Sequence, residues 1–220
     1  MTGSVRIMSA NLFKGRARAD VLAGTLRRVD PDVLCVQELD PVNAEVIAGA
    51  FEVVSLDPRE DANGLGIAAR SGARLGTIAM ALRDARTATV PFGAGTLEVV
   101  DLHLANPVER PWRRSAAIRS AQLAAVERHA VEVDGPFVIV GDMNASPAWS
   151  AYRRLAGGFV DLAVAAVGKP PPTWSYRHRL PRLLRIDHAF GRDVEPVSFT
   201  VERLAFSDHD AIVVEVAPSG

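Results

Sequence analysis

Short apolar runs rich in β-branched residues recur along the chain, and they constrain its fold more than any other feature. Most of these runs are too short for helices and are typical of strands. We expect strands at Val5–Ala10, Val33–Val36, Gly66–Ala69, Leu75–Ala81, Leu97–Leu104, Phe137–Val140, Ile186–Phe190, Val197–Val201 and Ala211–Val216. In the run that begins at Leu97, apolar residues alternate with Glu98 and Asp101. This alternation predicts antiparallel pairing with one face toward water.

Helical signals fall between these runs. We expect helices at Ala19–Val29, from Pro41 onward, over Ser115–Val131 and over Pro147–Leu155. Proline favours the first position of a helix, which supports the second of them. The longest carries an apolar stripe of Ala116, Leu123, Val126 and Ala130. Strands outnumber helices and no linker divides the chain, so we predict one mixed α/β (α+β) domain over residues 1–220. Its two sheets should pack face to face with helices outside.

Composition excludes little. The 220 residues carry a net charge of −1, so no overall charge indicates nucleic acid or membrane. Lys14 and Lys169 are the only lysines, so nearly all of the positive charge is arginine. Arginine suits bidentate phosphate contacts, but a coding bias explains the excess of arginine equally well. The single cysteine, Cys35, can form no internal disulfide. We see no membrane span and no signal-peptide pattern, and therefore expect a cytoplasmic location. The oligomeric state stays open.

Polar side chains follow the apolar runs where most of them end. They are Asn11, Gln37 and Glu38, His103 and Asn106, Asp142 and Asn144, Asp187 and His188, and Ser207 to Asp210. Each alone has an ordinary explanation, such as a turn residue or a surface acid. Burying such groups is costly unless they are paired or bind a metal. Together they predict a common rim of acids, amides and imidazoles that binds a ligand.

Two arginine clusters are interleaved with aromatic residues. The first comprises Arg110, Arg113 and Arg114 around Trp112. The second lies in the proline-rich segment Pro170–Arg185, which we interpret as a long loop. It follows Trp174 and Tyr176 and comprises Arg177, Arg179, Arg182 and Arg185. Such clusters can hold backbone phosphates and stack bases, or they can be solvated surface residues. From them we take Arg113 and Arg177 as candidate substrate-binding residues.

An ordered set of motifs resembles the endonuclease/exonuclease/phosphatase superfamily, which includes deoxyribonuclease-like and exonuclease-III-like metal-dependent phosphoesterases. The matching pieces, in order, are MSANLF, VQELD, GLGIAARS, VDLHL, RSAQL, GDMN, RIDHAF and SDHDAI. The resemblance spans Asn11 to His209 and implies a four-layer sandwich, two packed mixed β-sheets flanked by helices on both outer faces. It places the active site at the end of the sandwich where the strand-end residues meet.

The resemblance also implies a metal site, with Mg²⁺ as the usual ion and Mn²⁺ as a possible substitute. Glu38 is then the principal metal ligand and Asn11 its neighbour, and Asp208 completes the site directly or through water. Oxygen ligands of this kind suit a hard cation that keeps several waters. Such an ion would offset the charge that builds on a phosphoryl group under attack by water.

The same resemblance assigns the catalytic residues. His209, held by Asp187, contacts the phosphate or the attacking water. Asp142 positions or deprotonates that water, and His103 is a candidate general acid or transition-state donor. Asn144, with Asn11, binds the substrate by hydrogen-bonding the phosphoryl oxygen. We expect Asp142 and Asn144 to lie two apart in an extended chain and to point the same way.

Other residues refine this interpretation. Arg119 and Gln122 match a helical RxxQL pattern, and we expect Arg119 to be a buried structural partner. Phe13 stands where exonuclease-III-like repair enzymes carry an acid, which counts against two-metal or abasic-site specialisation. Asp210 adds negative charge beside the pocket and should repel polyanions.

Three functions remain open. The first is a Mg²⁺-dependent phosphodiesterase that acts on a phosphoester substrate, nucleic acid among the candidates. The second is a phosphatase or a lipid or small-molecule phosphodiesterase, and the third is a non-catalytic binding module, because a fold does not fix a function.

Overall fold

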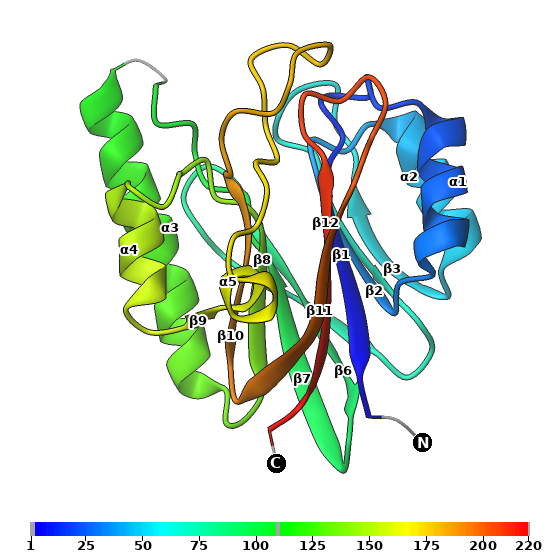
Figure 1. Cartoon of the computed structure of the whole chain (residues 1–220), viewed down its shortest axis with the longest axis vertical. Coiled ribbons are helices and arrows are strands. Elements are labelled where there is room, and N and C mark those ends of the chain that lie inside the picture. Colours follow the sequence, from blue (N-terminus) through cyan, green and yellow to red (C-terminus); the bar gives the residue numbers. More distant parts are fainter. Residues whose placement is uncertain (1–2, 109–110, 220) are drawn as a thin grey trace.

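Two β-sheets packed face to face form the centre of the molecule in a computed structural model that describes residues 3–108 and 111–219 (Figure 1). Within these residues each sheet has six strands. The first sheet runs in the order β11 (Val194–Glu202), β12 (Ala211–Pro218), β1 (Val5–Asn11), β2 (Val33–Gln37), β4 (Leu65–Ala69) and β3 (Val53–Asp57). The second runs β5 (Arg74–Ile78), β6 (Ala85–Phe92), β7 (Gly95–Asp101), β8 (Phe137–Asp142), β10 (Asp187–Arg192) and β9 (Val160–Asp161). Both sheets are mixed, because β1 pairs with β2 and β7 with β8 in parallel.

Helices cover both outer faces, which confirms the predicted four-layer sandwich. Helices α1 (Ala19–Val29) and α2 (Pro41–Ala50) pack on the first sheet, and α3 (Trp112–Glu132) and α4 (Ser150–Ala156) pack on the second (Figure 1). The short helix α5 (Leu162–Val167) contributes Leu162 and Ala163 to the core between the sheets. None of the helices in the described part of the chain has the length and apolarity needed to cross a membrane.

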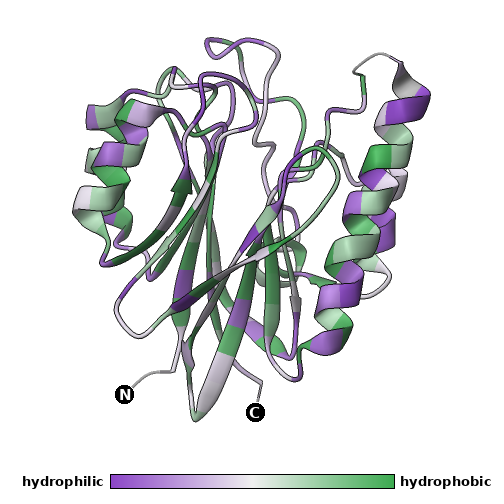
Figure 2. Ribbon diagram, turned by 180° about the vertical axis from the view of Figure 1, so that it is seen from behind, coloured by the Kyte–Doolittle hydropathy of each residue, from purple (hydrophilic) through white to green (hydrophobic). Residues whose placement is uncertain are grey.

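Alternating side chains explain why the central strands are apolar throughout. In β2, Val33 and Cys35 enter the core between the sheets, whereas Leu34 and Val36 pack against the helices. Strands covered on both faces need apolar residues at every position. The strands are accordingly mostly hydrophobic in Figure 2, whereas the helices carry hydrophobic and hydrophilic residues on different faces. Cys35 is buried, as expected of a core thiol.

Local signals in the sequence explain where the helices begin. Helix α2 starts at Pro41, and the side chain of Asp40 caps it by accepting hydrogen bonds from the backbone N–H groups of Val42 and Asn43. An N-terminal cap of this type satisfies donors that the helix leaves unpaired. Helix α5 has the same arrangement, because Asp161 accepts from the N–H of Val164.

The structure corrects several element predictions. Strands β3, β6 and β9 and helix α5 were not expected, and β7 ends at Asp101 rather than Leu104. Helix α3 begins earlier than predicted and α4 begins three residues later, at Ser150. Ala116, placed on the buried stripe of α3, is exposed. The missed strands β3 and β9 lie at sheet edges, where an apolar face is not required.

The prediction that one face of β7 is exposed to water is wrong. Glu98 is 7% exposed and Asp101 is fully buried, because β7 is an inner strand between β6 and β8. Asp101 instead joins the two sheets: the amide of Gln37 on β2 donates to its Oδ1 at 2.5 Å, and also to Ser9 Oγ at 3.2 Å. Burial raises the pKa of Asp101 well above its usual range, despite the opposing hydrogen bond from Gln37. Asp101 therefore retains its proton to higher pH in the folded state than in the unfolded chain.

Asp101→Asn should change the pH dependence of stability. Because the folded-state pKa is raised, the wild type loses stability as pH rises above the unfolded-state pKa, by up to ~1.4 kcal/mol per pH unit. Asparagine keeps the acceptor for Gln37 and cannot ionise. Urea denaturation at pH 5 and pH 8 should therefore show that the free energy of unfolding of the variant, relative to that of the wild type, is higher at pH 8 than at pH 5. The exposed Asp134→Asn is the control, and equal pH profiles for the wild type and Asp101→Asn would contradict this account.

Candidate active site

Strand pairing brings the predicted polar residues to one end of the sandwich. Parallel pairing of β1 and β2 sets Asn11 opposite Gln37, so Glu38 follows at the same edge. Antiparallel pairing in the second sheet sets Asp142 at the end of β8 directly opposite Asp187 at the start of β10. The two sheets meet here, because the Asn11 amide donates to Asp142 Oδ2 at 3.1 Å. Both sheets therefore contribute to one site.

Asp142 is delivered by an unusual turn. Gly141 has φ +138°, and a Cβ there would lie 2.0 Å from the carbonyl oxygen of Leu102, so only glycine fits. The expected extended geometry after it is wrong, because Asn144 has φ 45° in the left-handed region. Its side chain still reaches Asp142, with Nδ2 donating to Asp142 Oδ2 at 3.3 Å and to Leu104 O at 3.0 Å. Asn144 thus holds Asp142 in place.

His209 and Asp187 form a buried ion pair. His209 Nδ1 donates to Asp187 at 2.9 Å, and its Nε2 lies 3.7 Å from Asp142 Oδ2. Burial alone would lower the pKa of His209, but Asp187 and Asp142 outweigh it and raise the pKa to about 10. His209 is therefore an imidazolium at neutral pH, with Nε2–H directed at Asp142. Asp187 is fixed in turn by Thr173, whose hydroxyl donates to it at 2.5 Å.

Asp142 lies at the centre of the polar network. It accepts hydrogen bonds from the side chain of Asn11 and from the backbone N–H of Asn144, the latter at 2.8 Å. Burial raises its pKa to about 7 against the attraction of His209. A carboxyl group whose pKa lies near neutrality can both accept and return a proton under physiological conditions.

His103 lies on the other side of Asp142. Its Nε2 is 3.6 Å from Asp142 Oδ2, and its Nδ1 contacts Nη1 of Arg83. Burial, with the positive charges of Arg83 and His209, lowers the pKa of His103 well below its usual value. A guanidinium can only donate, so Nδ1 accepts and the single proton of the neutral ring lies on Nε2, facing Asp142. Arg83 has no sequence motif, and sequence reasoning missed it.

Two carboxylates at the site carry an unsatisfied oxygen. Glu38 Oε2 and Asp208 Oδ1 are buried and have no hydrogen-bond partner among the described residues. Burial raises the pKa of Glu38, and the neighbouring Asp208 raises it further, while His209 and Lys14 oppose them. Burial likewise raises the pKa of Asp208. An unpaired buried carboxylate is costly, so these oxygens fit a bound cation.

A second set of possible ligands lies beside them. Ligand atoms of Asp142, Asp187 and His209 lie within 4.8 Å of one another, and such a group could hold a metal ion. The Nδ1 atom of His209 is already bonded to Asp187, and Asp187 also accepts from Thr173. The free oxygens of Glu38 and Asp208 are therefore the better match to a hard cation, and Asn11 lies between Asp142 and Glu38.

The loop Pro170–Arg185 forms a wall of the site. Backbone hydrogen bonds join it to the segment that carries His209, from Asp210 N to Thr173 O and from Ser175 N to Asp208 O. The indole N–H of Trp174 donates to Asp208 Oδ2 at 3.2 Å. Sequence reasoning identified the loop and found none of these contacts, because no spacing pattern relates the two segments.

The second arginine cluster is divided by the fold. Arg182 donates to the carbonyl oxygens of Ser207, Asp208 and His209 and to Asp210 Oδ1 at 2.5 Å, so it holds the loop that carries His209, called the catalytic loop below for the role proposed for it. Arg185 pairs with Asp161. Only Arg177 and Arg179 remain exposed. Arg182 pairs with Asp210 and offsets the negative charge from which we predicted repulsion of polyanions.

The first cluster is only partly described. Arg110 lies outside the described residues, as does the side chain of Trp112, whereas Arg113 is exposed at the start of α3. Arg119 is buried, as expected: it donates to Ala105 O at 2.5 Å and to Met143 O at 3.2 Å. Gln122 accepts from Ala105 N at 2.9 Å.

Comparison with known proteins identifies the family and the fold. The Endonuclease/Exonuclease/phosphatase family model matches residues 8–209. A humanized D. rerio TDP2 structure superposes with a TM-score of 0.79 at 21% identity, covering 98% of this chain and 99% of that one. A functionally unknown conserved protein from Enterococcus faecalis superposes with a TM-score of 0.77 at 15% identity, covering 97% of this chain and 100% of that one. The human Nocturnin catalytic domain with a bound sulfate superposes with a TM-score of 0.71 at 16% identity, covering 100% of this chain and 96% of that one. A comparison with curated protein sequences found no match.

The fold and the family match thus place the chain in a class of proteins that are generally metal-dependent phosphoesterases. The chain belongs to the Endonuclease/Exonuclease/phosphatase family, whose members generally hydrolyse phosphoester bonds.

Asp187→Asn should shift the titration of His209. Asparagine keeps an acceptor for Nδ1–H and removes the charge that favours the imidazolium, so the pKa of His209 should fall from about 10 toward neutrality. NMR titration of the imidazole carbons in metal-free protein measures this shift. Asp193→Asn, on an exposed turn, is the control; an unmoved His209 titration would show that Asp187 does not set its charge.

Proposed function

We propose that the protein is a Mg²⁺-dependent phosphodiesterase, nuclease-like, that hydrolyses a phosphodiester with an activated water. One observation carries the proposal: buried carboxylates with unsatisfied oxygens lie beside an imidazolium at the seam of the two sheets. Four carboxylates, from Glu38, Asp142, Asp187 and Asp208, lie around His209 in the described residues. This excess negative charge favours a divalent cation, and the cation and His209 together favour a phosphate. The proposal treats residues 1–220 as one domain, because each sheet supplies part of the site.

Glu38 and Asp208, with Asn11, would hold the ion. When bound, it offsets the charge on the phosphoryl oxygens and lowers the pKa of coordinated water. The free oxygens of Glu38 and Asp208 support this ligand set, and the donor chemistry suits Mg²⁺ or Mn²⁺ equally.

The protein's own groups divide the remaining work. The Nε2–H of His209 donates to a phosphoryl oxygen, and Asp187 keeps that ring charged and oriented. Asp142, with its pKa near neutrality, accepts the proton of the attacking water. His103 is neutral, so it acts as a hydrogen-bond donor through Nε2 rather than as a strong acid. Asn144 positions Asp142, and its predicted contact with the phosphoryl oxygen requires its amide to give up a bond to Leu104 or Asp142.

Glu38→Gln should abolish most hydrolysis without unfolding the protein. Groups that merely support metal ligands contribute roughly 10- to 100-fold, so loss of a ligand should lower kcat/KM by about 100-fold or more. Without metal the variant should be at least as stable as the wild type, because a buried unpaired carboxylate is removed. Added Mg²⁺ or Mn²⁺ should raise the Tm of the wild type and leave that of the variant unchanged.

A substrate panel separates the remaining functions. It comprises single- and double-stranded DNA, RNA, nucleoside monophosphates, sphingomyelin and bis-p-nitrophenyl phosphate. Glu52→Gln, an exposed glutamate, is the matched control. Activity on monoesters alone would favour a phosphatase, and no activity on the whole panel with either metal would favour a non-catalytic binding module. Retained metal-induced stabilisation in Glu38→Gln would remove Glu38 from the metal site.

A further inference from the structure

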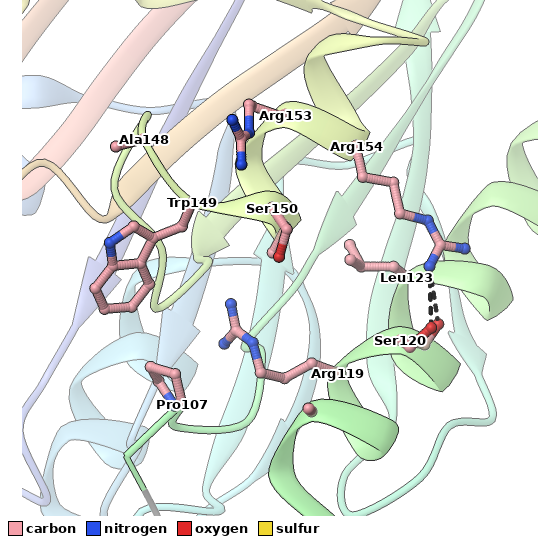
Figure 3. A pocket seen from close by; sticks show the side chains of 11 residues that line it. Pro107, Arg119, Ser120, Leu123, Ala148, Trp149, Ser150, Arg153 and Arg154 are labelled. Atoms are coloured by element: carbon pink, nitrogen blue, oxygen red, sulfur yellow. Dashed lines mark hydrogen bonds between the residues drawn. The ribbon is translucent and has the colours of Figure 1, made fainter. Parts of the chain in front are cut away.

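A positively charged cleft lies between α3 and α4, next to the site but separate from it (Figure 3). Its volume is about 660 Å³, within the roughly 300–1,000 Å³ of small-ligand sites. Three of its eleven lining residues are arginines, two are serines and none is acidic. In a chain of net charge −1 this local balance indicates an anionic ligand.

The two walls of the cleft come from two helices. One wall is a face of α3 that carries Ala116, Arg119, Ser120 and Leu123 at helical spacing. The small side chains of Ala116 and Ser120 leave room for the cleft over this face. The other wall comes from α4 and the residue before it: Trp149, the N-cap of α4, and Arg153 within the helix both line the cleft. Figure 3 shows the side chains of Trp149, Arg153 and Arg119 around the cleft.

The three arginines differ in what they can bind. Arg154 is paired with Glu127 and also donates to Ser120 Oγ, so it joins α4 to α3 and closes one end. Arg119 is held by backbone carbonyls, without an acidic partner in the described residues. Arg153 is exposed and has no ion pair in the described part of the chain. Trp149 is 40% exposed, unusual for so large an apolar side chain.

The cleft opens on the same loops as the active site. Pro107 follows His103 by four residues, and Ala148 follows Asn144 by four, and both line the cleft. Arg119 bonds Ala105 and Met143, so its head group lies between the loops that carry His103 and Asn144. The first half of α3 also lies at the end of the sheets that carries the site (Figure 1).

From this geometry we infer that the cleft is a subsite for single-stranded nucleic acid, with a base stacked on Trp149 and a phosphate bound by Arg153. The cleft is lined by both an exposed aromatic ring and an exposed arginine without an ion pair in the described residues, and such groups hold single strands without sequence preference. The inference rests on the proposed function, because the strand would pass from this cleft to the catalytic residues. A strand of one or two nucleotides fills the cleft, and its next phosphate lies at the loops of His103 and Asn144.

Binding of a labelled 12-nucleotide oligo-dT, measured by fluorescence anisotropy with metal chelated, tests the inference. Trp149→Ala should weaken binding about fivefold or more, and Trp149→Phe should restore it, because phenylalanine still stacks. Arg153→Ala should weaken binding and reduce the slope of log Kd against log salt by about 0.7, the share of one phosphate contact. Arg27→Ala, an exposed arginine on α1 on the opposite outer layer, is the matched control and should bind as the wild type does.

Hydrolysis separates this inference from the proposed function. All four variants should cleave bis-p-nitrophenyl phosphate as the wild type does, whereas Trp149→Ala and Arg153→Ala should lose kcat/KM on the oligonucleotide. If these two variants bind the oligonucleotide as tightly as Arg27→Ala, or if the wild type does not bind it, the subsite is overturned while the phosphodiesterase stands. If the binding losses occur and the wild type hydrolyses nothing, the subsite stands and the proposed function fails.

Discussion

The site depends on an imbalance of buried charge where the two sheets meet. Carboxylates from both sheets converge on one imidazolium, and burial raises the pKa of Glu38, Asp142 and Asp208. A fold does not keep such groups together for stability, because each is costly to bury without a partner. In the proposed function, a bound cation and a bound phosphate would lower this cost. This connects the energetics of the fold to the chemistry of the family: the polar end of an otherwise apolar sandwich is built to be completed by its ligands.

Polar contacts behind the site restrict how its groups can move. Thr173 and Asp187 fix the ring of His209, Arg83 fixes the tautomer of His103, and Arg182 holds the backbone of the catalytic loop. Catalysis requires such preorganisation, because a misplacement of about 1 Å can cost about 100-fold in rate. The loop Pro170–Arg185 is therefore part of the framework that holds these polar groups, and not a solvated excursion. Its exposed arginines and the cleft beside α4 lie outside this framework.

Much of the architecture follows from the sequence, and the omissions have physical causes. Nine of the strands in the described residues were predicted from their apolar runs, and the inner ones among them are apolar because they are covered on both faces. The missed β3, β6 and β9 and helix α5 lack such runs or are short, and periodicity weakens when one face needs no burial. Glu98 and Asp101 were assigned to a wet face because alternation alone cannot distinguish water from a buried polar partner, and for Asp101 that partner, Gln37, lies on the other sheet.

The sequence by itself determined the polar set at the strand ends and its order, because the set as a whole, unlike each member alone, has no ordinary explanation as turn residues or surface acids. It also determined the family, through motifs that each lie within a few residues. Only the tertiary structure decided which charges cancel: that Arg182 belongs to Asp210, that His103 is neutral against Arg83, and that Trp149 and Arg153 line a cleft with α3. These properties depend on contacts between residues far apart in the chain, and on burial, which changes a group's charge by removing water rather than by changing its neighbours in sequence.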